Sequence, residues 1–152
     1  MLLKTIIEKK HYLFLDHVDS WQESIRMSCK PLEADGTVDP SYAELIIECV
    51  DKFGPYIVLF PNYAMPHSTE NAKGVYGTAI SFMKLEKPVS FDTNDPSKDA
   101  KVFFTLASVD KDQHVENMQQ LFEMLTDEAL LESLLTVQSV EDLQKLADDH
   151  TF

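Results

Sequence analysis

The chain has 152 residues, of which 44% are hydrophobic, so it is long enough to bury one substantial core. We therefore expect residues 1–152 to form a single domain. Its 26 acidic and 13 basic residues give a net charge of −13, and the basic residues are scattered along the chain. This balance argues against nucleic acid and anionic membranes as partners, whereas a protein with a basic face would be attracted.

The N-terminal stretch MLLKTIIEKK contains too short an apolar run for a signal peptide, and no stretch approaches the roughly 20 apolar residues of a membrane-spanning helix. Cys29 and Cys49 lie among apolar neighbours in apparently helical segments, a setting typical of reduced core thiols and not of a disulfide framework. We expect a cytoplasmic protein with no direct membrane insertion.

The first half of the chain is predicted to contain two strands and two helices after a short amphipathic segment. Residues 12–18 (YLFLDHV) have the composition of a strand. Ser20 then begins a helix with Glu23 at the capping-box spacing, and Pro31 is expected to end or kink it.

A second helix is expected between Asp39-Pro40, which is a helix-start signal, and Gly54-Pro55, which end it. Its predicted apolar face consists of Tyr42, Ile46, Val50 and Phe53. Residues 56–60 (YIVLF) follow and are apolar at every position, which predicts a strand buried on both faces of a sheet.

The second half is predicted to contain two long strands followed by helices. Residues 74–85 (GVYGTAISFMKL) favour a central strand, with a bulge or a close backbone approach near Gly74 and Gly77. Residues 102–109 (VFFTLASV) favour another strand after a surface loop. From about His114 a helix is expected to place Met118, Leu121, Phe122 and Leu125 on the sheet. Two more helices, over residues 127–137 and 140–150, complete a single mixed sheet with helices on both faces, an α/β/α sandwich.

Two histidines follow predicted strands, where open α/β sheets usually carry their sites. His67 ends the run PNYAMPH, expected to be a loop stiffened by Pro61 and Pro66. A rigidly placed imidazole with one nitrogen held by a backbone carbonyl would be a competent nucleophile. His114 follows another apolar strand, predicted over residues 102–109, and the two rings would converge if both strands end at the same edge of the sheet.

The alternatives without a function are that His67 is a polar surface residue after a turn and that His114 is a surface residue at a helix start. The remaining histidines, His11, His17 and His150, lie in less telling contexts and are assigned no role.

Other kinds of site lack their sequence signals. There is no His-Glu-x-x-His or Cys-x-x-Cys, and two well-placed histidines are too few for a zinc site, so we expect no metal. The phosphate-binding patterns G-x-x-x-x-G-K-[ST] and G-x-G-x-x-G are absent, as is a serine nucleophile elbow, so we expect no cofactor. If His67 handles phosphate, another protein must supply it.

Three stretches in order, FGPYIVLFPNYAMPH (53–67), GVYGTAISFMKLEKPV (74–89) and LASVDKDQH (106–114), resemble the enzyme IIA components of the bacterial phosphoenolpyruvate-dependent sugar phosphotransferase system. The resemblance is to the mannitol/fructose class and, within it, is strongest to the ascorbate-specific branch. It spans essentially the whole chain. It implies the mannitol/fructose-type enzyme IIA fold and the activity of a protein-histidine phosphotransferase in sugar transport.

By this resemblance His67 would accept a phosphoryl group from the histidine phosphocarrier protein and pass it to a cysteine of a cognate enzyme IIB, for uptake of L-ascorbate. His114 would stabilise the phosphoryl group, with Ser68 and Gly74 as candidate phosphate contacts. The chain departs from the branch after its active histidine. An arginine is expected in a PH-x-R-P context, whereas the chain reads PHSTENAKG, leaving Ser68, Thr69 or Lys73 to supply donors.

The alternative function is a regulatory module of the same fold that signals by its phosphorylation state. A metal-dependent hydrolase fails on ligand count. The oligomeric state is left open, with a homodimer as one option. Phe60, Tyr63, Met65 and Met118 could form a docking patch for enzyme IIB, with core packing as the competing explanation for each.

Overall fold

The computed structural model describes residues 2–68 and 73–149, and these contain a five-stranded mixed sheet. The strands are β1 (Tyr12–Leu15), β2 (Val58–Phe60), β3 (Asn62–Ala64), β4 (Ala79–Ser90) and β5 (Asp99–Ala107). Their order across the sheet is β1-β4-β5-β3-β2. The β1–β4 and β3–β5 pairs are parallel, and the β4–β5 and β2–β3 pairs are antiparallel.

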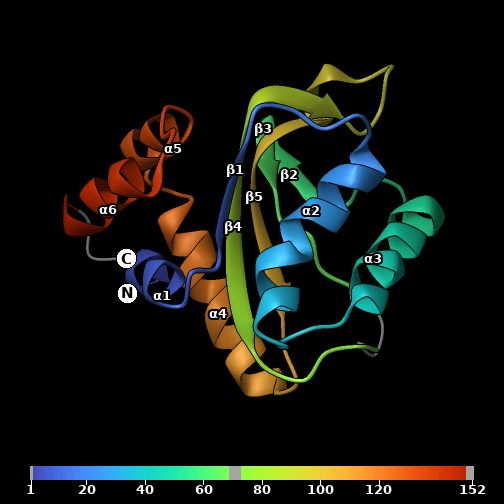
Figure 1. The fold of residues 1–152 in the computed structure, drawn as a ribbon. Coiled ribbons are helices and arrows are strands. Elements are labelled where there is room, and N and C mark those ends of the chain that lie inside the picture. Colours follow the sequence, from blue (N-terminus) through green and yellow to red (C-terminus); the bar gives the residue numbers. More distant parts are fainter. Residues whose placement is uncertain (1, 69–72, 150–152) are drawn as a thin grey trace.

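Helices cover both faces of this sheet, as the sequence predicts (Figure 1). The helices are α1 (Leu2–Glu8), α2 (Trp21–Ala34), α3 (Pro40–Phe53), α4 (Lys111–Met124), α5 (Glu128–Leu134) and α6 (Val140–Asp149), with a short 3-10 helix η1 (Pro96–Lys98). Figure 1 shows α2 and α3 on one side of the sheet and α1, α4, α5 and α6 on the other. The α/β/α sandwich is therefore confirmed. No helix in the described part of the chain is long and apolar enough to cross a membrane.

Each face of the sheet has its own hydrophobic core. The core under α2 and α3 includes Ile25, Ile46 and Phe103, and the core under the other helices includes Phe82 and Leu121. Alternate residues of the central strands supply the two cores, since Phe82 and Met83 are adjacent in β4 and face opposite sides. The cysteines Cys29 and Cys49 are both buried as free thiols.

The predicted helix starts are present. The Ser20 hydroxyl accepts a hydrogen bond from the Glu23 amide at the start of α2, and Asp39 caps α3 by accepting one from the Ser41 amide. Pro31 was expected to end or kink α2, and it does not end the helix, which continues to Ala34. The missing proline N–H falls in the last turn, so it costs the helix only one hydrogen bond.

The main errors of sequence reading concern the segment after residue 56. The apolar run YIVLF yields only a three-residue edge strand, β2, and not a strand buried in the middle of the sheet. The chain turns at Pro61, with Asn62 in the left-handed region at φ 78°, and returns as β3 between β2 and β5. Residues 62–64, expected to be loop, are therefore a strand inside the sheet.

Other boundaries also differ. β4 begins at Ala79, so Gly74 and Gly77 precede it, and it continues to Ser90 across a register shift against β5 between Lys84 and Val89. α4 starts at Lys111, before His114. Phe122 and Phe53 were expected on apolar helix faces, but they are 45% and 54% exposed. Phe122 lies at the edge of its apolar stripe, and Phe53 is the last residue of α3.

Candidate functional site

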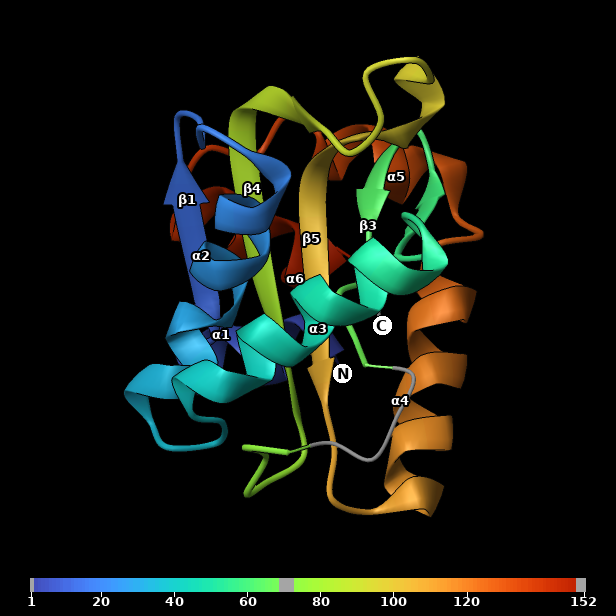
Figure 2. The same ribbon diagram turned by 90° about the vertical axis from the view of Figure 1, so that its right-hand side faces the viewer.

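His67 lies three residues beyond β3, at the edge of the sheet where β3 and β5 both end. The two strands are parallel neighbours, so the segments that leave them start side by side. Figure 2 shows the chain descending from β3 beside β5, with α4 following β5 on the same side. The strands that precede His67 and His114 therefore end at the same edge of the sheet. The strand before His67 is β3, and not the strand over residues 56–60 that the sequence indicated.

Backbone hydrogen bonds fix the segment that carries His67. The Met65 amide donates to the Ile57 carbonyl at 2.8 Å, and the Leu106 amide donates to the Pro66 carbonyl at 3.0 Å. The Tyr56 hydroxyl donates to the carbonyl of His67 itself. The loop is thus tied to β5 on one side and to the segment before β2 on the other.

The orientation of the His67 ring assigns its tautomer. Its Nδ1 lies 2.5 Å from the carbonyl oxygen of Met65, and a carbonyl can only accept, so Nδ1 carries the proton. The Tyr56 ring packs against the imidazole edge to face, with ring centroids 5.2 Å apart and an interplanar angle of 89°. In the neutral ring the lone pair is therefore on Nε2.

Burial lowers the pKa of His67 below its ordinary value of 6.5. The hydrogen bond to the Met65 carbonyl raises this pKa in part, and the charge of His114 lowers it further. His67 is therefore neutral and carries a free lone pair at neutral pH, which is the state that a nucleophile requires.

His114 lies in the first turn of α4, behind the Asp110 cap that accepts hydrogen bonds from Asp112 and Gln113. Its charge acts on the pKa of His67, so the two imidazoles lie close enough to interact. The Nδ1 atom of His114 is buried and has no hydrogen-bond partner among the described residues. An orphaned buried nitrogen facing a site would be satisfied by an incoming acceptor such as a phosphoryl oxygen.

Tyr42 of α3 supports the residue after His67. The Tyr42 hydroxyl donates to the Leu106 carbonyl at 2.5 Å. Burial raises the pKa of Tyr42 strongly, and hydrogen bonds from the amide and hydroxyl of Ser68 lower it in part. The donors of Ser68, a candidate phosphate contact, are thus directed to the Tyr42 oxygen in this structure.

Gly74, the other candidate phosphate contact, packs against the N-terminus of α3. Its carbonyl accepts from the Asp39 amide at 2.8 Å, and its φ of 76° is in the left-handed region. A Cβ atom there would collide with the side chains of Ser41 and Asp39. Glycine is therefore required by the backbone and by the close approach to α3.

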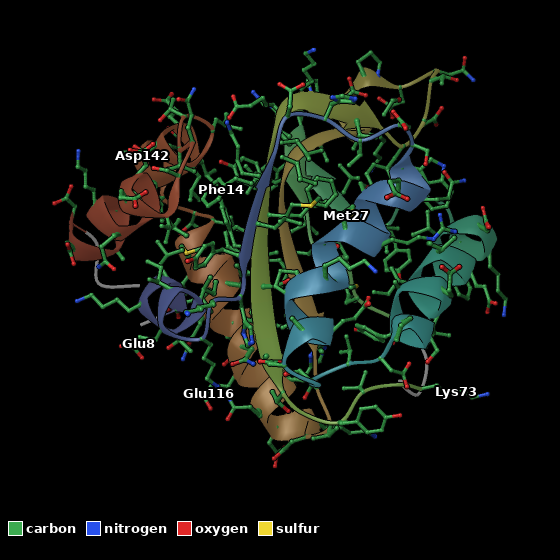
Figure 3. The ribbon with its side chains drawn as sticks, in the orientation of Figure 1. Glu8, Phe14, Met27, Lys73, Glu116 and Asp142 are labelled. Carbon is green, nitrogen blue, oxygen red and sulfur yellow. The ribbon has the colours of Figure 1, made fainter. Side chains whose placement is uncertain are left out.

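The structure also shows most of the residues that could replace the arginine expected after His67. Thr69 lies outside the described residues. Lys73 is exposed and points away from the body of the molecule (Figure 3). Arg26 belongs to α2, where its Nε donates to Glu44 at 2.7 Å. Of these two described cations, Lys73 and Arg26, neither is therefore directed at His67.

The other described histidines, His11 and His17, have local partners. His11 is 2% exposed, and its Nε2 lies 2.5 Å from a carboxylate oxygen of Asp35. His17 is exposed beside Asp16, and His150 lies outside the described residues. Within residues 2–68 and 73–149, no group of three or more His, Cys, Asp or Glu side chains is arranged to hold a metal ion.

The docking patch suggested by the sequence is mostly core. Tyr63 and Met65 are 3% and 1% exposed, and Tyr63 donates a hydrogen bond to the Leu131 carbonyl of α5. Residues that are exposed near His114 are Val109 and Val115, at 63% and 54%. Both residues flank the start of α4 and provide exposed apolar surface beside the site. The buried Tyr63 and Met65 provide none of this surface.

Sequence reasoning did not assign Tyr56 and Tyr42 to the site. Tyr42 was placed on the apolar face of its helix, which is correct, but its hydroxyl extends past the core to Leu106 and Ser68. A tyrosine on an otherwise fully apolar helix face is the available signal, because a buried phenol needs a hydrogen-bond partner.

Comparisons with known proteins agree on one family. The family model for "Phosphoenolpyruvate-dependent sugar phosphotransferase system, EIIA 2" matches residues 5–149. The chain is 31% identical over 150 residues to the ascorbate-specific PTS system EIIA component of Escherichia coli K12, covering 97% of this chain and 95% of that protein.

Solved structures give the same result. The mannitol-specific cryptic phosphotransferase enzyme IIA CmtB from Escherichia coli is 30% identical, with a TM-score of 0.85 over 99% of this chain and 100% of that one. A complex of mannitol enzyme IIA with phosphorylated enzyme IIB from Escherichia coli matches at 25% identity, with a TM-score of 0.74 over 91% of this chain and 94% of that one.

Proposed function

Because the chain belongs to the EIIA 2 family of the phosphoenolpyruvate-dependent sugar phosphotransferase system, we propose that it carries a phosphoryl group on Nε2 of His67. The hydrogen bond from His67 Nδ1 to the Met65 carbonyl is the observation that supports this assignment most directly. It fixes the proton on Nδ1 and leaves the Nε2 lone pair available for attack.

The donor is the histidine phosphocarrier protein. The Nε2 lone pair of His67 attacks phosphorus and forms the new P–N bond, while the P–N bond of the donor breaks and its imidazole recovers the electron pair. The His67 ring gains positive character, which the Met65 carbonyl stabilises through the Nδ1–H bond. Since one phosphohistidine replaces another, the step is close to balanced and needs no nucleotide.

His114 stabilises the transferred group. An imidazole N–H near the phosphorus can donate a hydrogen bond to a charged phosphoryl oxygen, and such charge-assisted bonds are about twice as strong as neutral ones. The unpartnered Nδ1 of His114 supports this role. The contact must favour the transition state over the phosphorylated ground state, since otherwise it would slow delivery. Ser68 and Gly74 are proposed as further contacts, with Ser68 first exchanging its bonds to Tyr42.

Phosphorylation tests the assignment directly. The chain is incubated with phosphoenolpyruvate, enzyme I and the histidine phosphocarrier protein, and wild type is expected to gain one acid-labile, alkali-stable phosphate. His67→Ala should gain none, whereas His17→Ala, which removes an exposed histidine paired with Asp16, should behave as wild type. Stoichiometric phosphate on the His67→Ala variant would refute the proposal.

The acceptor is proposed to be the cysteine of an ascorbate-type enzyme IIB in the cytoplasm. A structural relative is solved in complex with phosphorylated enzyme IIB, and relatives at 31% and 33% identity are ascorbate-specific components. Phosphorylated chain is mixed separately with the enzyme IIB proteins of the ascorbate and mannitol systems. We expect faster transfer to the ascorbate protein, and equal or faster transfer to the mannitol protein would contradict the substrate assignment.

A further inference from the structure

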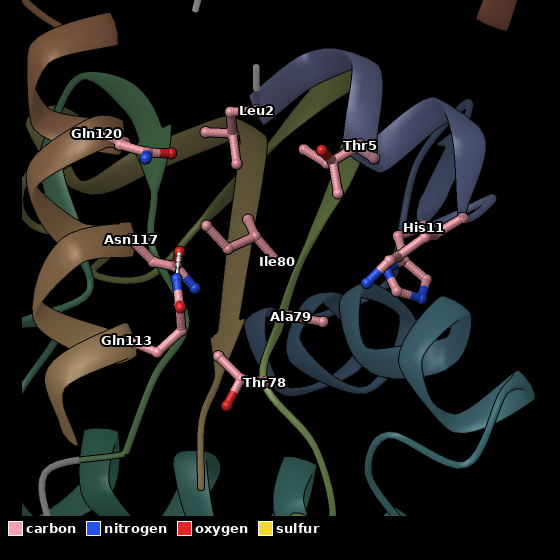
Figure 4. Close-up of a pocket in the computed structure, with 11 residues that line it drawn as sticks. Leu2, Thr5, His11, Thr78, Ala79, Ile80, Gln113, Asn117 and Gln120 are labelled. Atoms are coloured by element: carbon pink, nitrogen blue, oxygen red, sulfur yellow. Dashed lines mark hydrogen bonds between the residues drawn. The ribbon is translucent and has the colours of Figure 1, made fainter. Parts of the chain in front are cut away.

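A cavity of about 490 Å³ lies between α1, the start of β4 and α4 (Figure 4). This volume is within the range of roughly 300–1,000 Å³ that is usual for small-molecule sites. Neither His67 nor His114 is among the described residues that line the cavity. The cavity is therefore a separate feature from the candidate phosphoryl site, although it shares helix α4 with His114.

The wall on α4 is a ladder of side-chain amides. Gln113, Asn117 and Gln120 line the cavity at successive turns of the helix, and Figure 4 shows them on the side that faces Ile80 and Thr78. The Gln113 amide nitrogen donates to the Asn117 carbonyl oxygen at 2.9 Å, and this bond does not use the donors of the Asn117 amide nitrogen. Amides both donate and accept, so such a row suits a ligand with several hydroxyl groups.

The charge of the lining is unusual for this chain. The chain has 26 acidic residues among 152, but none of the 11 described residues that line the cavity is acidic. Lys9, which follows α1, and His11 also line the cavity, and Figure 4 shows His11 on the side opposite α4. The His11 ring is held through Nε2 by Asp35, and Lys9 is the cationic residue of the lining.

The floor of the cavity is apolar. Leu2 and Ile6 of α1 and Ile80 of β4 are 8%, 1% and 5% exposed, and all three belong to the core on that face. An apolar floor with polar groups around it is the usual way in which proteins hold a sugar ring or a short carbon chain by its C–H surface and its hydroxyls.

We propose that this cavity binds a small polyhydroxylated anion of monosaccharide size, a sugar acid or a sugar phosphate. The amides of Gln113, Asn117 and Gln120 would bind the hydroxyls, Lys9 would bind the anionic group, and Ile80 would contact the carbon skeleton. The proposal adds a bound ligand to the proposed phosphoryl transfer and does not depend on that transfer. Binding is measured on the unphosphorylated chain, so the outcome does not require phosphorylation of His67.

Binding is tested by NMR titration of the isotope-labelled full chain with gluconate, glucose 6-phosphate and uncharged glucose at constant ionic strength. We expect saturable shifts at Ala79, Ile80 and the Asn117 side-chain amide for at least one of the two anions. Saturation by gluconate alone identifies a carboxylate ligand, and saturation by glucose 6-phosphate alone identifies a phosphate ligand. Glucose should bind at least about tenfold more weakly than the better anion, a difference of one decade in Kd.

Adjacent residues provide matched controls. Gln120→Leu should weaken binding about tenfold or more, whereas Gln119→Leu on the same helix should not, because Gln119 is not part of the lining. Lys9→Met should weaken binding and Lys10→Met should not, although both change the net charge equally. The proposal is overturned by shifts confined to the His67 region, by equal effects of each matched pair, or by no saturation with either anion.

Discussion

The Nδ1 atom of His67 lies 2.5 Å from the carbonyl oxygen of Met65, two residues earlier in the same rigid loop. This contact sets the tautomer of the imidazole, and burial lowers its pKa below 6.5. The neutral ring with a free Nε2 should therefore persist to a lower pH than in an ordinary surface histidine.

The pH dependence of His67 follows from this lowered pKa. As the pH falls, phosphoryl acceptance should decline with a midpoint below 6.5, because the ring becomes protonated only around its lowered pKa. The folded pKa is below the unfolded value, so the unfolded chain binds more protons as the pH falls through 6.5, and the free energy of unfolding should decrease. Nitrogen-15 NMR of the imidazole checks both the tautomer and the midpoint, and His67→Gln should lose this part of the pH slope. A midpoint at or above 6.5 would contradict the prediction.

The Tyr56→Phe variant tests whether Tyr56 positions His67 for phosphorylation in addition to stabilising the fold. The variant loses the hydrogen bond to the His67 carbonyl, which is expected to cost about 1 kcal/mol of unfolding free energy. It should also slow phosphorylation by roughly tenfold, because a small misplacement of a reacting group is costly. Urea unfolding and rapid-quench phosphorylation measure the two effects.

The matched control for Tyr56→Phe is Tyr63→Phe, which also removes a tyrosine hydroxyl from a backbone carbonyl, that of Leu131. It should have a similar stability cost and leave the phosphorylation rate unchanged. If both variants slow phosphorylation equally, loss of stability and not positioning of His67 would be the cause.

His114→Ala should still be phosphorylated on His67 but should deliver the group to enzyme IIB more slowly. The expected loss is roughly 10- to 100-fold, the effect of one charge-assisted hydrogen bond of about 1.5–3 kcal/mol. Single-turnover transfer from the phosphorylated variant measures it. His114→Gln, which keeps a donor, should be less impaired, and full-speed transfer by His114→Ala would remove His114 from the mechanism.

Sequence patterns predicted the parts of this fold that have strong local signals. The caps at Ser20 and Asp39 and the apolar periodicity of the helices specify local structure, so both helix starts were located. His67 and His114 were both singled out because each follows a predicted strand. Their proximity, however, depends on the β3–β5 pairing, which is a long-range contact.

The parts that were missed are those decided by tertiary contacts. β3 is only three residues long and follows Pro61, so neither its length nor its composition distinguishes it from a loop. The predicted strand stopped at Leu85, whereas β4 continues through Pro88 to Ser90, and the register shift in this region leaves room for a residue without an N–H. The hydroxyl contacts of Tyr42 and Tyr56 depend on where distant segments meet, which a single sequence does not indicate.

Gly74→Ala tests the packing of the segment after His67 against α3. The residue has a φ of 76°, which costs a non-glycine residue about 1 kcal/mol or more, and the new Cβ would collide with Ser41 and the Asp39 cap. Displacing that cap costs about 1 kcal/mol further, so the total should be about 2–4 kcal/mol in urea unfolding. Gly36→Ala is the control, because its φ is 79° and nothing lies within 4 Å of the added Cβ, so it should lose only the backbone part. Equal losses in the two variants would show that the contact between Gly74 and α3 does not constrain this segment.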